Sequence, residues 1–429
     1  MAEISPFQGI RYNQDKIKDM AAVICPPYDV ISHEEQQSYY QKSDHNIIRL
    51  EHGVELPDDT AKNNKYTRAR TTFDYWLKDS ILKTDTTPTF YIYEQGFTAG
   101  GAKKKRLGII GCVKLEPWEH RVIFPHENTL QKVKSDRLEL MRACNSNISP
   151  ILGLYEDPGG RVAQLLQAKS LPSKLLMDIT IGNETHRIWK ANEPEFVQRS
   201  SHFIYPKPIY IADGHHRYET SLAYREERKK ATPSYSGYEA FNFILMTLVS
   251  FSDPGLVMLP IHRLIKGIQP KALSALLDQI SNFFEIKSTP LNTFELVENK
   301  IPGIKVVGLE PGQVLTLRLS PRASVDEFMP KERSAVYRKL DVSIVEHLII
   351  EKLLGFQSAS DHVTYTADTE QALKLVAVQD HQLAILLSAM PVTTIKAIAD
   401  ANDRMPRKST YFYPKLPTGL VINRLDGRL

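Results

Sequence analysis

One segment places several polar side chains where a strand pattern gives way to a helix pattern. A β-branched run ends in Asp213-Gly214, two histidines and Arg217 follow at once, and a helical pattern then continues to Lys230. A helix N-terminus presents free backbone N–H groups and a partial positive charge. Glycine lets a ligand approach the backbone, and the planar guanidinium of arginine suits phosphate. The segment predicts a phosphate site with Asp213 as its acid/base or metal-binding neighbour, and its candidate ligand-binding residues are Gly214, His215, His216 and Arg217.

A purely structural interpretation of the same segment stays open. Asp213 can serve as the N-cap of the helix, with the two histidines as solvated residues of its first turn. The density of polar groups between a clear strand and a clear helix favours the functional interpretation.

Four more polar clusters are candidates for the same site. His126-Glu127 precedes a helix that carries cations, which suits a metal or a phosphate group, although ion pairs spaced i,i+4 explain such a helix equally simply. His262-Arg263 stands at a strand end, where α/β sheets face their ligands. Lys408-Ser409 and Tyr28-Asp29 lie in turns, and each is also typical of a polar surface loop. The candidate catalytic residues are Asp213, Glu127 and His126, and the further candidate phosphate ligands are Arg137, His262, Arg263, Lys408 and Ser409.

A divalent-metal site is an alternative use of the helix. His216 and Glu219 are three residues apart, so both side chains can lie on one helix face. Together with Asp213, His126 or Glu127 they would suit a hydrolytic metal centre, with Asp213 and Glu219 as the candidate ligands. The sequence contains neither a G-x-x-x-x-G-K-[ST] loop nor an H-E-x-x-H pattern.

The composition is that of an ordinary globular protein. The chain has 429 residues, 42% of them hydrophobic and 24% charged, with a net charge of +4. This charge is too small to indicate a nucleic-acid or membrane surface. Three cysteines without metal-type spacing fit a reducing compartment, and the first residues lack the pattern of a signal peptide. We expect a cytoplasmic protein without nucleic-acid or membrane partners; the oligomeric state stays open.

Alternating strand and helix patterns predict an α/β (α+β) fold with a mixed sheet. Residues 46–50 suggest a strand, and residues 90–93 and 107–113 a hairpin whose basic tip, 98–106, is interpreted as a solvated loop. Residues 241–250 predict a buried strand and residues 340–354 a strong helix. We expect an α/β domain over 1–266 and an α+β region over 267–429, whose tail either stays there or packs back on the first domain.

The motifs together resemble the bacterial and archaeal family known as domain of unknown function 1015. The resemblance runs in order through Pro26-Pro-Tyr-Asp-Val-Ile31, His126-Glu-x-Thr129, the Asp213-Gly-His-His-Arg217 segment, Leu259-Pro-x-His262-Arg263 and Met405-Pro-x-Lys408-Ser-Thr-Tyr-Phe-Tyr-Pro-Lys415. The family has no established activity, so this resemblance alone assigns no function.

A second resemblance covers only one motif. Gly214-His-His-Arg217 at a strand-to-helix turn is similar to the phosphate-binding turn of the ParB, sulfiredoxin and free-serine-kinase superfamily. His215 stands where sulfiredoxins have their reactive cysteine, and no DNA-reading helix-turn-helix is evident. The resemblance therefore implies a kinase-like protein that binds ATP or ADP with Mg²⁺.

The leading hypothesis is a nucleotide-dependent phosphotransferase acting on a small hydroxyl metabolite, with free serine as one candidate. Two alternatives remain. One is a nucleotide-binding regulatory protein without metabolite chemistry, and the other is a metal-dependent phosphohydrolase.

Overall fold

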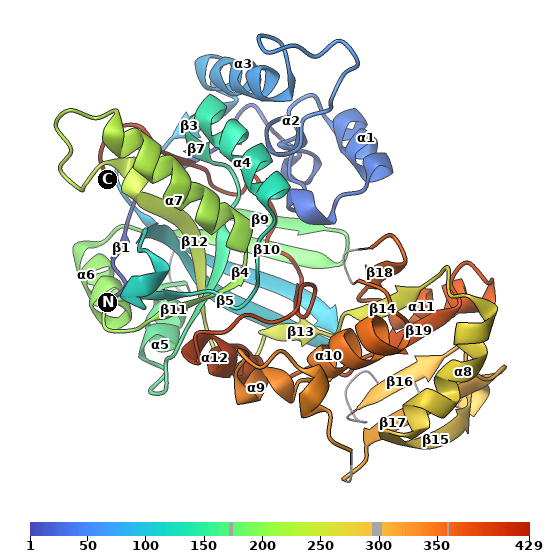
Figure 1. Cartoon of the computed structure of the whole chain (residues 1–429). Coiled ribbons are helices and arrows are strands. Elements are labelled where there is room, and N and C mark those ends of the chain that lie inside the picture. Colours follow the sequence, from blue (N-terminus) through green and yellow to red (C-terminus); the bar gives the residue numbers. More distant parts are fainter. Residues whose placement is uncertain (171–174, 294–302, 322, 358–359) are drawn as a thin grey trace. The chain divides into compact units, whose positions relative to one another are not determined.

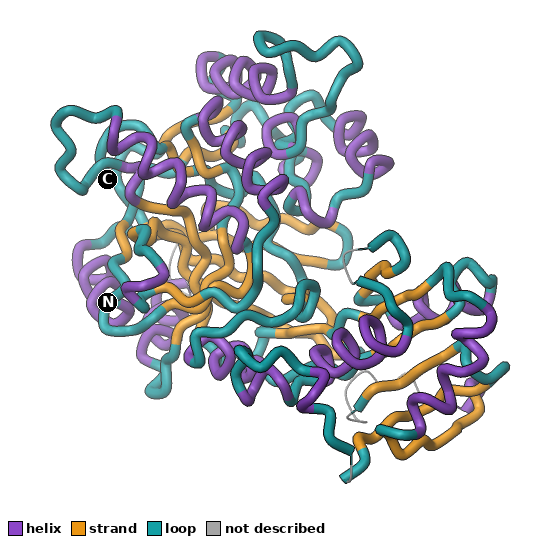
Figure 2. The backbone as a smooth tube through the Cα atoms, in the orientation of Figure 1, coloured by secondary structure: helices purple, strands orange, loops and turns teal. Residues whose placement is uncertain are grey.

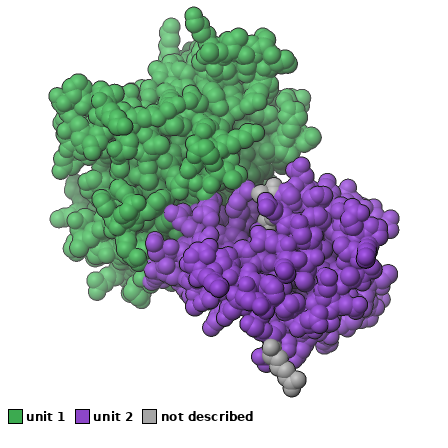
Figure 3. Space-filling model, in the orientation of Figure 1, with its two compact units in different colours: residues 1–125, 129–256, 414–429 green, residues 126–128, 257–413 purple. Residues whose placement is uncertain are grey.

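The computed structural model describes residues 1–170, 175–293, 303–321, 323–357 and 360–429. These residues form two compact units, coloured separately in Figure 3. Unit 1 holds residues 1–125, 129–256 and 414–429, and unit 2 holds residues 126–128 and 257–413. Whereas the sequence suggested a boundary near residue 266, the chain passes into unit 2 after residue 256, and residues 414–429 belong to unit 1.

Unit 1 is built on a mixed nine-stranded sheet. Its central strand β12 is an uninterrupted buried run, Phe-Ile-Leu-Met-Thr-Leu-Val-Ser, which pairs parallel with β8 and antiparallel with β5. Because both faces of β12 are covered, it needs apolar side chains on each side. The sheet order is β6 (Ile123–Phe124), β11 (Ile209–Asp213), β8 (Ile151–Tyr155), β12 (Phe243–Ser250), β5 (Ala102–Lys114), β4 (Phe90–Ala99), β10 (Glu184–Ala191) and β9 (Leu175–Ile181), with β1 (Ile4–Ser5) also paired to β5.

Helices of unit 1 pack on this sheet and on one another. Figure 1 shows α7 running alongside α4, and α7 also contacts β8, while α3 packs on α4 and α5 on α6. The bounds are α1 (His33–Lys42), α2 (Ile48–Glu51), α3 (Lys65–Lys78), α4 (Gln131–Cys144), α5 (Arg161–Ser170), α6 (Pro194–Ile204) and α7 (His215–Lys230). Two short pairs complete the unit: β2 (Ile10–Tyr12) with β3 (Leu82–Thr84), and β7 (Ser146–Asn147) with β21 (Asn423–Arg424).

Unit 2 has its own six-stranded sheet and core. The sheet order is β15 (Phe284–Pro290), β17 (Gln313–Leu319), β16 (Ile304–Val307), β19 (Leu383–Leu386), β14 (His262–Ile265) and β18 (Val363–Thr366). A separate pair joins β13 (Val257–Leu259) to β20 (Tyr411–Tyr413). Its helices are α8 (Pro270–Ser281), α9 (Ala335–Arg338), α10 (Asp341–Ile344), α11 (Thr369–Ala377) and α12 (Val392–Asp400).

The expected α/β (α+β) class with a mixed sheet is confirmed, and Figure 2 shows helices and strands alternating along the tube. Two local predictions were wrong, and a third, the helix over 340–354, was confirmed but with a different helix type over most of its length. The strand expected at 46–50 is instead the short helix α2. The helix expected over 340–354 begins as α10 but continues as a π-helix over Val345–Leu353. The basic run before residue 107 is not a loop, because β5 begins at Ala102 and Arg106 is only 1% exposed.

Among the residues that the structure describes, no helix is both long and apolar enough to cross a lipid bilayer.

Candidate functional site

The strand, turn and helix predicted around Gly214 are present. Strand β11 ends at Asp213, and α7 begins at His215 with Gly214 as its N-cap residue. Gly214 has a φ of 98° and a ψ of 28°, a left-handed conformation that favours glycine. Having no side chain, Gly214 does not itself accept a hydrogen bond from the first turn of α7, as a Ser or Asp N-cap would. Asp213 is therefore not the N-cap of α7, and the helix N-terminus is of the kind that binds anions.

Asp213 lies between two cations. Its Oδ2 accepts a hydrogen bond of 2.7 Å from Nη2 of Arg217, and its Oδ1 accepts one from Nζ of Lys415. Burial raises the pKa of this carboxyl. The charges of Lys415 and Arg217 lower the pKa by more than burial raises it, so the pKa lies well below its usual range. Asp213 is thus held ionised and is a weak proton acceptor.

Arg217 is 9% exposed and turns back toward the start of its own helix. Its Nη1 donates to the carbonyl of Pro150, while its Nε has no hydrogen-bond partner among the described residues. A Cβ atom placed on Gly214 would lie 3.0 Å from that Nε. The partnerless donor of Arg217 therefore faces the N-cap glycine.

His216 and Glu219 of α7 bind to α4 and to the residues just before it. His216 accepts a hydrogen bond of 2.9 Å from the backbone N–H of Leu130 through its Nε2. Oε2 of Glu219 accepts hydrogen bonds of 2.5 Å from Thr129 and 3.0 Å from Lys134. His215 is buried, with 4% exposed. Asp213 and Glu219, the candidate metal ligands, thus bind different cationic partners, and the described residues include no cluster of three or more His, Cys, Asp or Glu side chains suited to a metal.

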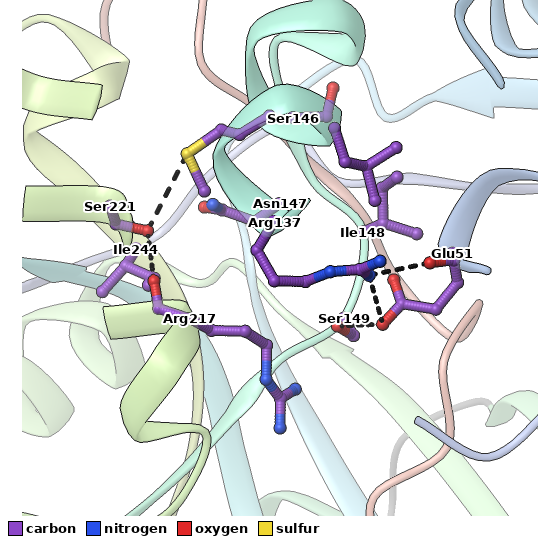
Figure 4. Close-up of a pocket in the computed structure, with 11 residues that line it drawn as sticks. Glu51, Arg137, Ser146, Asn147, Ile148, Ser149, Arg217, Ser221 and Ile244 are labelled. Carbon is purple, nitrogen blue, oxygen red and sulfur yellow. Dashed lines mark hydrogen bonds and ion pairs between the residues drawn. The ribbon is translucent and has the colours of Figure 1, made fainter. Parts of the chain in front are cut away.

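A pocket beside the turn shares Arg217 with it (Figure 4). Its volume is about 40 Å³, and Glu51, Arg137 and Ser149 line it together with Arg217. Nη1 of Arg137 donates to the backbone carbonyl of Glu51 at 2.7 Å and lies 3.8 Å from Oε1 of that residue, to which the Ser149 hydroxyl donates at 3.0 Å. Arg137 also binds Asp136 and stacks 4.1 Å above the ring of Tyr28.

Glu51 differs from Asp213 in its electrostatics. It is 2% exposed, and burial raises its pKa, while Arg137, Arg217 and the Ser149 hydroxyl lower it less. A carboxylate whose pKa is raised in a pocket is a better candidate for accepting a proton than one whose pKa is lowered.

The remaining predicted residues lie in unit 2. Nε2 of His126 is 3.0 Å from Oγ1 of Thr410, whose hydroxyl is 3.4 Å from Oε1 of Glu127. The Lys408-Ser409 turn holds Lys408 at a φ of 55°, and the Ser409 hydroxyl donates to the carbonyl of Pro406. The structure therefore brings the His126-Glu127 and Lys408–Thr410 motifs together, although they are almost 300 positions apart in the sequence.

The His262-Arg263 pair is built into the interior of unit 2. Nδ1 of His262 accepts a hydrogen bond of 3.2 Å from the backbone of Leu387, and its Nε2 is 2.9 Å from Oγ1 of Thr369. Burial, helped by the charge of Arg263, lowers the pKa of His262 to about 4. Arg263 is 0% exposed, lies over the ring of Tyr365 and donates to the carbonyl of Ile261.

Three residues of the turn and pocket escaped the sequence analysis. Glu51 lies on a helix that we expected to be a strand, and Ser149 precedes an apolar run without belonging to any motif. Lys415 closes a motif that was noted only as a resemblance. The position of Lys415 just after an aromatic strand pattern was the signal that the sequence offered.

The family model with the description "Protein of unknown function (DUF1015)" matches residues 4–343. A comparison with curated proteins finds no match. Among solved structures, a conserved hypothetical protein from Pyrococcus furiosus is similar at 12% identity and a TM-score of 0.35, over 70% of this chain and 92% of that one. A free serine kinase in complex with AMP has 14% identity and a TM-score of 0.33, over 70% and 89%. A C-terminally truncated SbnI from Staphylococcus aureus has 11% identity and a TM-score of 0.35, over 74% and 87%. Similarity at this level carries no functional argument.

Proposed function

This chain belongs to a family of proteins of unknown function, and we propose that it is a nucleotide-dependent phosphotransferase acting on a small hydroxyl metabolite. The observation that carries the proposal is the start of α7, where a glycine N-cap adjoins the partnerless Nε of Arg217. Backbone N–H groups and a guanidinium converging on one point are suited to a phosphate. The proposed nucleotide is ATP or ADP with Mg²⁺.

The pocket beside the turn is the proposed place for the acceptor. In this arrangement Glu51 takes the proton of the acceptor hydroxyl. The acceptor oxygen then forms a bond to the terminal phosphorus of the nucleotide, and the bond from that phosphorus to its bridging oxygen breaks. The products are the phosphorylated acceptor and a nucleotide shorter by one phosphate, and the proton stays on Glu51 until solvent removes it.

Asp213 takes a positioning role in this scheme rather than that of the base. Its two oxygens hold Arg217 and Lys415, so it fixes the direction in which these cations point. His126 and Glu127 stay candidate catalytic residues of unit 2, and Lys408, Ser409, His262 and Arg263 stay candidate phosphate ligands.

Binding is the first part of the test. Isothermal titration with Mg-ATP and Mg-ADP is expected to show binding that weakens at least tenfold in Gly214→Ala, because the new Cβ would fill the phosphate position 3.0 Å from Arg217. Gly237→Ala is the matched control, since Gly237 has a similar φ of 89° and open space around it. If Gly214→Ala bound the nucleotide as well as the wild type does, the phosphate would not bind at this turn.

Turnover is the second part. Purified protein with Mg-ATP and a pool of hydroxyl metabolites, free serine among them, is expected to form a phosphorylated product detectable by mass spectrometry. Glu51→Gln keeps the shape of the pocket but removes the base, so kcat is expected to fall by about 100-fold while nucleotide affinity is retained. Failure of every nucleotide to bind to the wild-type protein would reject the proposal.

A nucleotide-binding regulatory protein is the second candidate. It is favoured by the full engagement of Asp213, both of whose oxygens are already paired with cations. Tight nucleotide binding without turnover for any acceptor would select this alternative.

A further inference from the structure

Arg106 is a buried cation close to the α7 turn that neither the sequence motifs nor the proposed mechanism uses. It lies in β5 opposite Gln95 of β4 and is only 1% exposed. Its Nη2 donates to the side-chain oxygen of Gln95 at 2.5 Å and to the carbonyl of Pro414 at 2.7 Å. Neither its Nε nor its Nη1 has a hydrogen-bond partner among the described residues.

A buried arginine with two unmatched nitrogens needs an explanation. A buried donor without an acceptor costs about 1–3 kcal/mol, and more when the group is charged. The nearby carboxylates are engaged elsewhere: Asp253 accepts from the backbone N–H groups of Leu107 and Gly255, and Glu184 accepts from Gln95. The unmatched donors of Arg106 are therefore available to an acceptor that the chain itself does not supply.

The fold holds Arg106 firmly in this position. The Asp253-Pro-Gly255 turn packs on the backbone of β5, and a Cβ atom on Gly255 would lie only 2.1 Å from the carbonyl oxygen of Lys105. Such a close approach is possible only for glycine. Because the strand is held on one side by this turn and on the other by Gln95, the guanidinium is preorganised.

Arg106 is connected to the α7 turn through Lys415. The Pro414 carbonyl, which Arg106 binds, immediately precedes Lys415, and Lys415 binds Asp213, which in turn binds Arg217. Asp213 is also one of the carboxylates whose charge acts on Arg106. Lys415 and Arg217 thus bind Asp213 directly, Arg106 is linked to them through the Pro414 carbonyl, and both arginines have partnerless buried nitrogens.

We infer that Arg106 is a second guanidinium of the phosphate site, so that the site takes a condensed phosphate of two or more units rather than a single phosphate. This inference rests on the proposed phosphate site at α7. One phosphate unit occupies the helix N-terminus beside Arg217, and the next unit accepts from the unmatched Nε and Nη1 of Arg106. In this arrangement each phosphate unit supplies acceptors for the unmatched donors of one buried arginine.

The test compares phosphates of increasing length. Isothermal titration of the full chain with orthophosphate, pyrophosphate and tripolyphosphate is expected to show affinity rising with chain length. Arg106→Gln is expected to lose about 10- to 100-fold in affinity for pyrophosphate and tripolyphosphate, the size of one or two charged hydrogen bonds, and to bind orthophosphate as the wild type does.

Lys105→Gln is the matched control. It removes the same charge from the neighbouring position of β5, where the lysine side chain is 67% exposed. It is expected to keep the dependence on chain length. Arg106→Lys serves as a second variant if Arg106→Gln does not fold, because it retains the charge but loses the planar fork; a partial loss for tripolyphosphate is expected.

Two outcomes separate this inference from the proposed function. If the wild type binds Mg-ATP or pyrophosphate and Arg106→Gln binds them equally well, the role of Arg106 is rejected and the proposed function stands. If the wild type binds no phosphate compound at all, both are rejected.

Discussion

The chain contains two histidine–arginine pairs of the same sequence, His216-Arg217 and His262-Arg263, and the structure uses them differently. The first pair opens a helix after a glycine, so that Arg217 faces the N-cap Gly214 and shares Asp213 with Lys415. The second pair lies inside strand β14, where the backbone is already paired on both sides. The same two residues thus occupy the start of a helix in one place and the middle of a paired strand in the other.

Charge compensation separates the two pairs as well. Arg217 has a direct ion pair of 2.7 Å with Asp213. Among the residues that the structure describes, Arg263 forms no ion pair; burial lowers its pKa, and the charges of Tyr365, Glu346 and Glu127 act on it in the opposite direction. The ion pair makes the first arginine part of a charged network, whereas the second is a buried cation that lies over an aromatic ring and donates to a backbone carbonyl.

The largest effect is expected from Asp213→Asn. It leaves two cations, Arg217 and Lys415, without their carboxylate in a largely buried place, so the free energy of unfolding is expected to fall by about 3 kcal/mol. Urea denaturation followed by circular dichroism measures this loss. The loss is expected at neutral pH and to shrink below about pH 4, because a carboxyl whose folded pKa is depressed stabilises only while it is ionised. A loss that stays constant on acidification would contradict the ion-pair account.

The next effect concerns pH and His262. Its folded pKa of about 4 lies below the ordinary value of about 6.5, so the unfolded chain binds a proton first as the pH falls. The free energy of unfolding is therefore expected to drop by roughly 3 kcal/mol between pH 6.5 and pH 4 because of this residue.

His186 of unit 1 also has a pKa of about 4 and contributes over the same range of pH. The measurement is therefore the difference between wild type and His262→Gln, with His186→Gln as the matched variant. A pH profile that His262→Gln leaves unchanged would show that His262 is not buried in its neutral form.

The smallest effect is expected from Arg263→Met. An isolated buried cation can be replaced by an apolar side chain of similar length at little cost. The free energy of unfolding is expected to change by less than about 1 kcal/mol, measured by the same urea titration. A loss as large as that of Asp213→Asn would mean that both pairs belong to equally strong charged networks, and the contrast between them would fail.

The sequence indicated the strand, glycine and helix of the site because each is determined locally. A β-branched run, a glycine and a helical period need no distant partner to be recognised. The sequence did not indicate which distant residues pair with one another. Lys415 reaches Asp213 across 202 positions, and Ser149 reaches Glu51 across 98. Such contacts depend on how the strands are ordered, which no local pattern encodes.

Arg106 shows a second limit of prediction from sequence patterns. Three lysines precede it in an obviously basic run, so charge alone indicated a solvated loop. The strand period of two places Arg106 on the same face as Gly108 and Ile110, which are buried. Extending that alternation backward from the apolar half of β5 would have placed Arg106 inside.

The route of the chain through the two units constrains the order in which they can form during synthesis. Unit 2 is encoded between residue 256 and residue 414, while Lys415, which completes the network around Asp213, comes after it. At 5–20 residues per second, roughly ten to thirty seconds separate the synthesis of Leu256 from that of Lys415. During that interval Asp213 and Arg217 exist without Lys415, and Arg106 without the Pro414 carbonyl. The nascent chain therefore passes through a stage in which most of unit 2 has been synthesised while the ion-pair network around Asp213 in unit 1 is still incomplete.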